Sequence, residues 1–360
     1  MAQPQATTQM RMEIAQQPEA LRATIEALLP RAGDLAAVAA GTRQVLLIAR
    51  GTSDNAAVYG TYLIQVRAGR LATLASPSVA TVYRSRLDLS GVLAVGLSQS
   101  GRTEEIVDTL RWARDCGART VGITNRGDSP LATAADVALI THAGAERAVP
   151  ATKTFTTQLA ALAVLGIGLG ADADAGELRA VPEEIERLIS TPMNLDPLVG
   201  ELCAVAGVVV SGRGFAYSAA LELALKLKEA CYLHAMGLSY ADLLHGPIAV
   251  VSGADPAQLP GSSRSGTPAI IVASDRGPML DPSIALARRV TGSDARAYAI
   301  GGGAALAQAC TWALPGPRLP EWLAPIGLIV PGQLLAEALA RRLGINPDSP
   351  RGLTKVTQTI

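Results

Sequence analysis

The chain has 360 residues, 49% of them hydrophobic and 17% charged, which is the composition of a folded globular protein of about two domains. Its formal net charge is zero and aromatic residues make up only 3%, so a nucleic-acid or membrane-surface role has little support. The longest apolar run, residues 159–169, is too short to span a bilayer, and the N-terminus lacks the apolar segment of a signal peptide. We therefore expect a soluble, cytoplasmic protein.

The thiols and imidazoles show no metal-binding pattern. The four cysteines are far apart without a CxxC pair, and the three histidines lack zinc-ligand spacing. Isolated thiols are typical of proteins from a reducing compartment. We expect no metal site.

Strand and helix patterns alternate through the first half of the chain. Residues 9–40 place apolar side chains roughly on one face and predict a helical arm. Continuous apolar runs then predict strands that alternate with helices, which indicates a parallel sheet covered on both faces. The predicted strands are 45–49, 92–97, 120–124 and 137–141, and the predicted helices begin at about 54 and cover 104–115 and 154–169.

The same alternation restarts after a more charged stretch, residues 171–200, which predicts a connecting helix. Residues 207–221 resemble residues 45–58, since both have an apolar strand, Arg-Gly and a small-residue turn into an Ala-rich helix. Chance is one explanation for so short a match, but the restarted alternation favours two similar α/β halves. The later predicted elements are strands 269–273 and 297–300, a helix over 332–343 and a polar tail.

A cluster of hydroxyl residues follows the strand at 92–97. Ligands of doubly wound sheets bind at the carboxyl ends of strands, where the N–H groups of helix N-termini are available. The loop Ser98-Gln99-Ser100-Gly101, with Thr103, offers three hydroxyls and a glycine, and Ser53 follows the first strand. Simple helix capping is the ordinary explanation for such residues. The chain has neither a GxxxxGK[ST] motif nor GxGxxG at its Gly-rich turns, so a phosphate group is favoured over a nucleotide.

A mostly apolar helix predicted over residues 219–233 contains Glu222, Lys226 and Glu229, which fall within an arc of roughly 60°. An exposed charged stripe would explain this spacing. The alternative is an acid–base site, because His245 follows in a loop bounded by Gly and Pro, and a carboxylate with a histidine near a phosphate suits proton transfer on a sugar phosphate.

These segments together resemble the sugar isomerase (SIS) family, specifically its double-SIS members that act on glucosamine 6-phosphate. The resemblance implies an α/β fold with two SIS-type, doubly wound, parallel-sheet (flavodoxin-like) subdomains. The matching segments are 50–53, 98–103, 148–162, 212–235, 243–247 and 348–359. The implied organisation is an N-terminal helical arm (1–40), a first SIS domain (41–170), a connecting helix (171–200), a second SIS domain (201–343) and a C-terminal active-site tail (344–360).

The segments are similar to the isomerase half of glutamine–fructose-6-phosphate aminotransferase, and still more to SIS-type glucosamine-6-phosphate deaminases because of residues 76–83 and 355–359. The chain begins without the nucleophilic cysteine and glutaminase domain of the aminotransferases, so we expect deamination rather than synthesis. Ala151 stands where the aminotransferases typically have serine, and Met236 and Leu244 replace polar residues. The hexosamine specificity is therefore less securely implied than the family.

The resemblance also implies a role for each residue. Glu229 is the base that moves a proton between C2 and C1, and His245, contributed by the neighbouring subunit of a homodimer, opens the sugar ring. Lys355 closes over the sugar, while Glu222 and Lys226 position the base or form a purely structural ion pair. The phosphate contacts are Ser98, Gln99, Ser100 and Thr103, and the sugar pocket is lined by Ser53, Val149 and Thr152.

The implied reaction converts glucosamine 6-phosphate and water to fructose 6-phosphate and ammonia without a metal or other cofactor. The alternatives are an isomerase or deaminase acting on galactosamine 6-phosphate or a fructosamine 6-phosphate, and a phosphosugar-binding regulator without catalysis. The implied partner is a small sugar phosphate, with no nucleic acid and no membrane.

Overall fold

The computed structural model describes residues 7–251, 253 and 266–355, and these residues form two compact units. The N-terminal unit consists of residues 17–146 and 153–182, and the C-terminal unit of residues 7–16, 147–152 and 183–355. The units do not follow chain order, because the first helix and a short middle segment belong to the C-terminal unit. Residues 356–360, part of the predicted active-site tail, lie outside the described residues.

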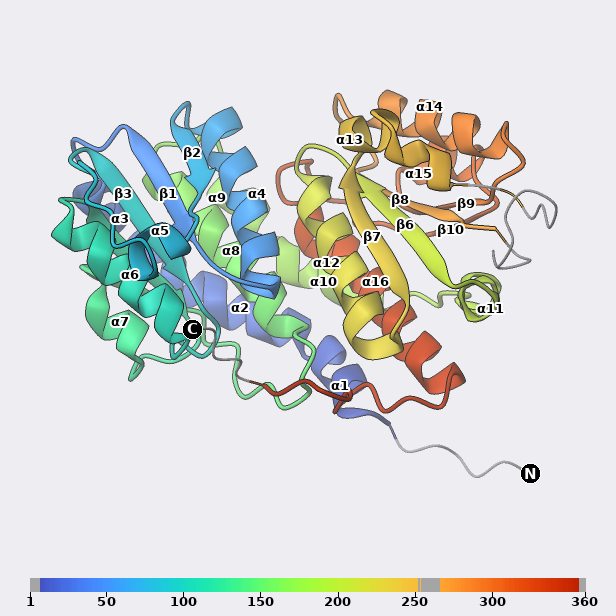
Figure 1. Cartoon of the computed structure of the whole chain (residues 1–360), viewed down its shortest axis with the longest axis horizontal. Coiled ribbons are helices and arrows are strands. Elements are labelled where there is room, and N and C mark those ends of the chain that lie inside the picture. Colours follow the sequence, from blue (N-terminus) through green and yellow to red (C-terminus); the bar gives the residue numbers. More distant parts are fainter. Residues whose placement is uncertain (1–6, 252, 254–265, 356–360) are drawn as a thin grey trace. The chain divides into compact units, whose positions relative to one another are not determined.

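The N-terminal unit has one five-stranded parallel sheet with strand order β2-β1-β3-β4-β5 (Figure 1). Its elements in chain order are α2 (Gln17–Leu28), η1 (Leu29–Arg31), α3 (Ala32–Val38), β1 (Gln44–Ile48), α4 (Thr52–Arg67), β2 (Leu71–Leu74), α5 (Ser78–Thr81), β3 (Val92–Leu97), α6 (Glu104–Asp115), β4 (Arg119–Thr124), α7 (Pro130–Ala134), β5 (Val137–Ile140), α8 (Lys153–Gly168) and α9 (Ala175–Arg179).

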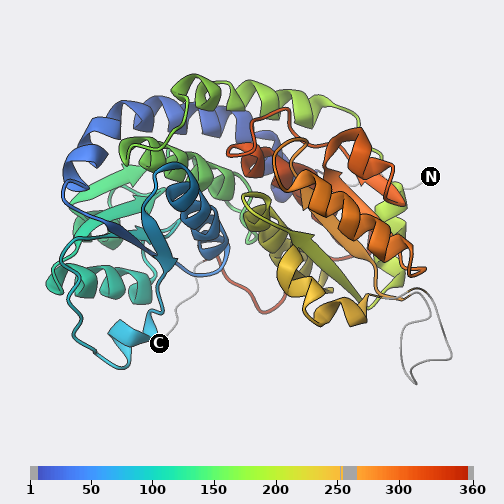
Figure 2. The same cartoon turned by 90° about the horizontal axis from the view of Figure 1, so that it is seen from above.

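Helices cover both faces of this sheet, as its continuous apolar strands predict. All six residues of β3 are buried, which requires apolar neighbours above and below the strand. Helices α2, α3 and α4 pack with α8 on one face, and α5 and α7 pack with α6 on the other. Figure 2 shows the strands between the two helix layers.

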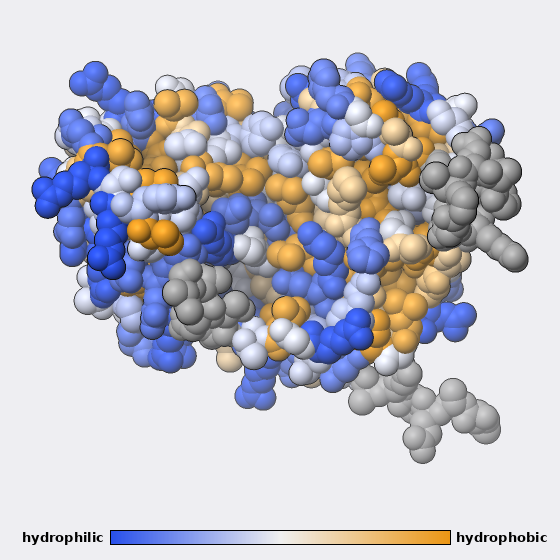
Figure 3. Space-filling model, in the orientation of Figure 1, coloured by the Kyte–Doolittle hydropathy of each residue, from blue (hydrophilic) through white to orange (hydrophobic). Residues whose placement is uncertain are grey.

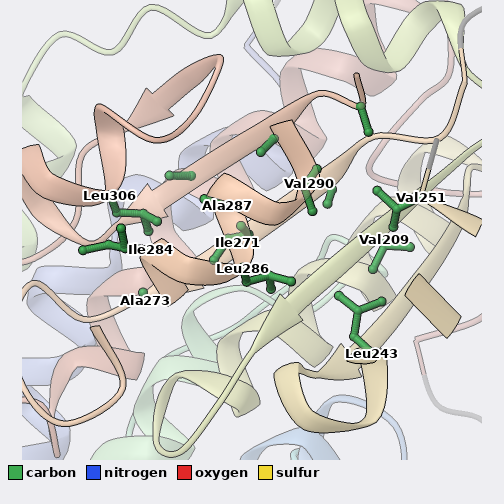
Figure 4. Packing of buried hydrophobic residues seen from close by; sticks show 14 residues of the cluster. Val209, Leu243, Val251, Ile271, Ala273, Ile284, Leu286, Ala287, Val290 and Leu306 are labelled. Atoms are coloured by element: carbon green, nitrogen blue, oxygen red, sulfur yellow. The ribbon is translucent and has the colours of Figure 1, made fainter. Parts of the chain in front are cut away.

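The C-terminal unit has a second five-stranded parallel sheet, with strand order β10-β9-β8-β6-β7. Helices α12 and α16 pack together on one face, and α13, α14 and α15 lie on the other, where the core shown in Figure 4 forms. The elements are α1 (Gln9–Ala15), α11 (Asp196–Ala204), β6 (Gly207–Gly212), α12 (Ala216–Cys231), β7 (His234–Ser239), α13 (Tyr240–Leu244), η2 (Pro247–Val250), β8 (Ala269–Ala273), α14 (Leu280–Thr291), β9 (Ala297–Gly301), α15 (Gly303–Ala307), β10 (Trp312–Leu314) and α16 (Ala324–Arg342), and α10 (Val181–Ser190) contains the boundary between the units.

The two sheets share one topology. When the strands of each half are numbered in chain order, both sheets have the order 2-1-3-4-5, and a long helix, α8 or α16, follows the fifth strand. The short sequence match between residues 45–58 and 207–221 therefore joins equivalent positions, β1–α4 and β6–α12. The prediction of two similar α/β halves is confirmed at the level of strand order.

Several predicted helices differ from the observed ones, and prolines explain most of the differences. The predicted arm over 9–40 is divided into α1, α2, η1 and α3, with Pro18 and Pro30 in the first turns of two of them. The predicted connecting helix is divided into α9, α10 and α11. Helix α16 begins at Ala324 rather than 332, and it continues through Pro331, which a sequence pattern treats as a helix end.

The surface mixes hydrophilic and hydrophobic side chains on the face shown in Figure 3. Within the described ranges, no helix combines the length and apolar character needed to cross a membrane.

Candidate functional site

The N-terminal unit places the predicted phosphate loop at the switch point of its sheet. Strands β1 and β3 are neighbours, but the chain leaves them in opposite directions along the sheet, toward β2 and β4 respectively. Ligands of doubly wound sheets bind in the crevice outside such a pair of strands. Ser53 follows β1 and the loop 98–103 follows β3, so both lie at this edge.

The loop after β3 is a compact turn held by its own polar groups. Ser98 is buried, and its hydroxyl accepts a hydrogen bond from the Gly101 N–H at 3.2 Å and lies 3.3 Å from the Thr103 hydroxyl. The Ser100 hydroxyl accepts from the Arg102 N–H at 3.2 Å. Thr103 occupies the N-cap position of α6, but its side chain makes no capping hydrogen bond. Capping alone therefore does not account for this threonine.

Gly101 is required by the geometry of this turn. Its φ is +63°, and a Cβ atom there would lie 2.2 Å from the Ser129 hydroxyl oxygen and 2.8 Å from Thr124 Oγ1. A side chain would therefore combine backbone strain with a collision against the neighbouring loop. The backbone can take this path only with glycine.

A glutamine not predicted from the sequence orients Ser53. Ser53 lies in the first turn of α4, and its hydroxyl accepts a hydrogen bond from Gln158 Nε2 on α8 at 3.0 Å. Both side chains are buried, and the Gln158 Oε1 atom has no hydrogen-bond partner among the described residues. Because the Ser53 oxygen already accepts a bond, its O–H is free to donate elsewhere. No sequence signal identified Gln158, because its partner Ser53 lies 105 residues away in the chain.

An ion pair joins the loop after β1 to the first turn of α6. The Arg50 guanidinium donates two hydrogen bonds to the Glu105 carboxylate on α6, at 2.9 and 3.0 Å. The parallel arrangement of two bonds fixes orientation as well as distance. Arg50 thus holds the start of α4 beside the start of α6.

The acid–base residues predicted on α12 form one cluster in the C-terminal unit. Lys226 Nζ lies 2.5 Å from Glu229 Oε2 and 3.3 Å from Glu222 Oε1. The Lys226 and Glu222 side chains are 0% exposed, whereas Glu229 is 24% exposed. An exposed charged stripe is therefore excluded, since only Glu229 reaches the surface of this unit.

The charge state of Lys226 follows from its two neighbours. Burial alone would lower the pKa of the ammonium, but the Glu222 and Glu229 carboxylates outweigh burial and raise this pKa above its ordinary value. Lys226 thus remains a cation at neutral pH. It can orient Glu229 but cannot itself act as a base.

His245 lies at the surface of the C-terminal unit. It is the exposed C-cap residue of α13, and its backbone N–H donates to the Asp242 carbonyl oxygen. Gly246 follows with a φ of +128°, so the chain turns sharply after the histidine.

The segment 147–152 and the C-terminal tail meet in the C-terminal unit. Lys355 Nζ donates to the Ala148 carbonyl oxygen at 2.7 Å, and the Val149 N–H donates to the Asp348 carbonyl oxygen at 2.9 Å. Thr152 is buried, and its carbonyl oxygen accepts from the side chain of Gln333 at 3.2 Å. The structure thus brings Lys355 beside the segment that contains Val149 and Thr152.

The predicted site residues therefore form groups within the units. Ser98, Gln99, Ser100 and Thr103 share one loop of the N-terminal unit, with Ser53 at the same sheet edge, and the remaining candidates belong to the C-terminal unit. Glu222, Lys226 and Glu229 contact one another, and Lys355 lies beside the segment of Val149 and Thr152. Among the residues that the structure describes, no group of three or more His, Cys, Asp or Glu side chains could hold a metal ion.

Two doubly wound sheets of one topology, with a hydroxyl-rich loop at the switch point of the first, define a duplicated α/β protein of the kind that binds small ligands at strand ends. The family model of the SIS domain matches residues 40–168. A Silicibacter pomeroyi protein assigned to the phosphosugar isomerases is 30% identical with a TM-score of 0.84, and the match covers 95% of this chain and 100% of that one.

The chain is also 32% identical to a glutamine–fructose-6-phosphate aminotransferase of Pyrococcus horikoshii, over 96% of this chain and 57% of that protein. It thus spans little more than half the length of the curated relatives it matches. A glucosamine-6-phosphate deaminase of Thermotoga maritima shares the fold, with a TM-score of 0.74 and 22% identity over 98% of this chain and 100% of that one. The chain belongs to the SIS domain family and is homologous to the C-terminal, isomerase domain of glutamine–fructose-6-phosphate aminotransferase.

Proposed function

We propose that this protein is an isomerising glucosamine-6-phosphate deaminase, which converts glucosamine 6-phosphate and water to fructose 6-phosphate and ammonia. Membership of the SIS family and homology to an enzyme named for fructose 6-phosphate support a phosphosugar substrate. We further propose that the second half is a SIS module like the first, because its strand order is the same.

The observation that carries the proposal is the cluster on α12. Glu229 is the one acid of the cluster that reaches the surface of the unit, and it is held by a buried, cationic Lys226. A fixed carboxylate that can take a proton from one carbon and return it to the next is what an aldose–ketose shift requires. Glu222 neutralises the same lysine from the buried side, so both acids keep Lys226 in place.

Binding of the phosphate is assigned to Ser98, Gln99, Ser100 and Thr103. The uncapped start of α6 supports this role, because hydroxyls and helix N–H groups together stabilise an anion without a lysine. Ser53, oriented by Gln158, would donate to the sugar or to its phosphate. Binding at the phosphate, remote from C1 and C2, supplies energy that orients the reacting carbons.

The reaction then proceeds on the open chain. His245 moves a proton from O1 to O5 and opens the ring, which exposes the C1 aldehyde beside the C2 amine. Glu229 removes the proton from C2 and returns it to C1, while the C2 nitrogen gives up one proton and O1 gains one, so the C2 amine becomes a C2 imine. Water adds to this imine and ammonia leaves, which gives the C2 ketone. Lys355, Val149 and Thr152 line the sugar during these steps.

We assign His245 to the active site of a neighbouring copy in a homodimer. The histidine is exposed on its own chain, which supports a role outside its own unit. Mixing of inactive His245→Ala and Glu229→Gln variants tests the assignment. If the histidine acts in trans, each mixed dimer contains one intact site and activity returns; if it acts in cis, the mixture stays inactive.

The function is tested by ammonia release from the purified protein with glucosamine 6-phosphate, galactosamine 6-phosphate and fructosamine 6-phosphate. We expect release with the glucosamine compound and its loss in Glu229→Gln. The matched control is Glu186→Gln, the same change at an exposed acid of the C-terminal unit. Isomerisation without ammonia would overturn deamination, and tight binding without any reaction would identify a regulator.

A further inference from the structure

Three segments that are distant in the sequence interlock in the C-terminal unit: helix α1, residues 147–152 and the tail from residue 348. The Asp348 carboxylate accepts the N–H groups of Gln9 and Met10 at 2.8 and 2.7 Å and so fixes the start of α1. The Asp348 carbonyl oxygen accepts the Val149 N–H at 2.9 Å. The tail is therefore bonded both to α1 and to the middle segment.

Glu13 completes this arrangement from the other side of α1. Its side chain is 0% exposed, and Oε1 accepts the Arg147 N–H at 2.5 Å while Oε2 accepts the Ala148 N–H at 3.2 Å. Oε1 also accepts from the Gln9 side chain at 3.1 Å. A buried carboxylate with several N–H donors is held far more rigidly than a neutral pair would be. Glu13 thus fixes two consecutive peptide groups.

The peptide group that follows these two carries the acceptor of Lys355. The Ala148 N–H is bound by Glu13, and the Ala148 carbonyl oxygen accepts Lys355 Nζ at 2.7 Å. That carbonyl belongs to the next peptide unit, whose Val149 N–H donates to the Asp348 carbonyl oxygen, and the Ala148 Cα joins this unit to the planar unit that Glu13 binds. Movement of the Glu13 carboxylate would therefore move the acceptor of the lysine.

We propose that Glu13 is a positioning residue, which holds segment 147–149 in the arrangement that catalysis needs. In that arrangement the Ala148 carbonyl oxygen holds the Lys355 ammonium in place and Val149 lines the pocket. This inference rests on the proposed function for the roles of Lys355 and Val149. Helix α1 then helps to position the proposed active-site residues of the C-terminal unit. Neither shorter Asp nor neutral Gln can replace Glu13, because Asp cannot reach both N–H groups and Gln would face one of them with its own NH₂.

The test compares Glu13→Gln with Glu19→Gln, an identical change at an exposed acid nearby. Steady-state rates are measured with glucosamine 6-phosphate. We expect Glu13→Gln to lower kcat by about tenfold or more and to change KM by less than about threefold, because the phosphate loop is untouched. In a Lys355→Ala background, Glu13→Gln should cause little further loss of kcat, since Glu13 acts through Lys355. Glu19→Gln should match the parent protein.

A second readout does not depend on activity. The rate at which an amine-specific reagent labels Lys355, read by mass spectrometry, should rise at least about threefold in Glu13→Gln and stay unchanged in Glu19→Gln, because release of Ala148 frees the ammonium. If Glu13→Gln does not fold, Gln9→Ala serves instead. It removes one hydrogen-bond donor to the Glu13 carboxylate and should change the labelling rate of Lys355 in the same direction. Unchanged labelling, a loss confined to KM, or losses that multiply in the double variant would overturn the proposal. A parent protein that turns over no sugar phosphate refutes the proposed function, while the labelling result still decides the role of Glu13.

Discussion

Replacement of Lys226 by methionine tests whether the charge of Lys226 stabilises the Glu222 and Glu229 carboxylates of α12. Methionine has nearly the length of lysine, so the change removes the charge and leaves most of the packing. It leaves Glu222, which is 0% exposed, without the cation that it faces at 3.3 Å. Glu229 is 24% exposed and can be hydrated instead. The cost therefore comes mainly from Glu222.

The magnitude follows from the burial of the pair. Removal of one partner of a buried ion pair costs ~3–5 kcal/mol, because the remaining charge is uncompensated. In a domain of this size such a loss lowers Tm by ~6–20 °C. The loss should be smaller at pH 5 than at pH 8, since a proton can then neutralise the buried carboxylate of the variant. Lys226 of the parent remains charged over this range, because the two carboxylates outweigh burial and raise its pKa.

The assay is thermal and urea unfolding of the parent, Lys226→Met and Glu222→Leu/Lys226→Met at both pH values. The double variant removes both charges and should recover most of the lost stability, to within ~2 kcal/mol of the parent, because a buried pair can be replaced by apolar side chains at little cost. Both variants should be inactive, as Glu229 loses its partner. A single variant as stable as the parent, or a double variant less stable than the single one, would refute the reasoning.

Three further predictions concern other parts of the chain. Gly101→Ala should weaken phosphosugar binding by at least about tenfold in calorimetry, whereas Gly69→Ala, at a φ of +62° with open space around it, should bind like the parent. Gln158→Met should raise Kd for the sugar phosphate about three- to tenfold with little change in kcat, because the serine hydroxyl loses its orientation; an unchanged Kd would contradict that role. Burial, with a smaller contribution from Cys203, raises the pKa of the Cys231 thiol to about 12, so at pH 8 only about one Cys231 thiol in ten thousand is ionised. Iodoacetamide should therefore label the exposed Cys203 before Cys231. Faster labelling of Cys231 would contradict this prediction.

The strands were predictable because burial on both faces leaves little choice of residue. Strands β3 and β8 and helix α6 agree with the predicted bounds, β4 and β5 differ by one residue at one end, and β1 and α8 begin and end one residue earlier than predicted. Short edge elements such as β2, β7 and β10 were missed. Their residues are partly exposed, and their apolar runs are interrupted or only three residues long.

The candidate site divides in the same way. Residues that lie close in sequence, such as Glu222 and Lys226, could be placed together by helical periodicity, although their complete burial could not. Gln158 and Glu13 could not be placed, because their partners lie 105 and 134 residues away in the chain. Such contacts depend on tertiary structure, and a single sequence has no pattern that encodes them.

The two halves differ in the loop that follows the third strand of each sheet. The loop after β8 is the topological equivalent of the loop after β3, but after its first serine, Ser274, it has Asp275 and Arg276 where the first half has Gln99 and Ser100. Burial raises the pKa of this carboxyl, while the nearby backbone N–H groups of Gly302 and Gly303 act in the opposite direction. A carboxyl of the protein itself thus lies beside the N–H groups of Gly302 and Gly303, which disfavours an added anion there. This difference supports the proposal that the phosphate binds at the first sheet, while the acid–base cluster of α12 belongs to the second half.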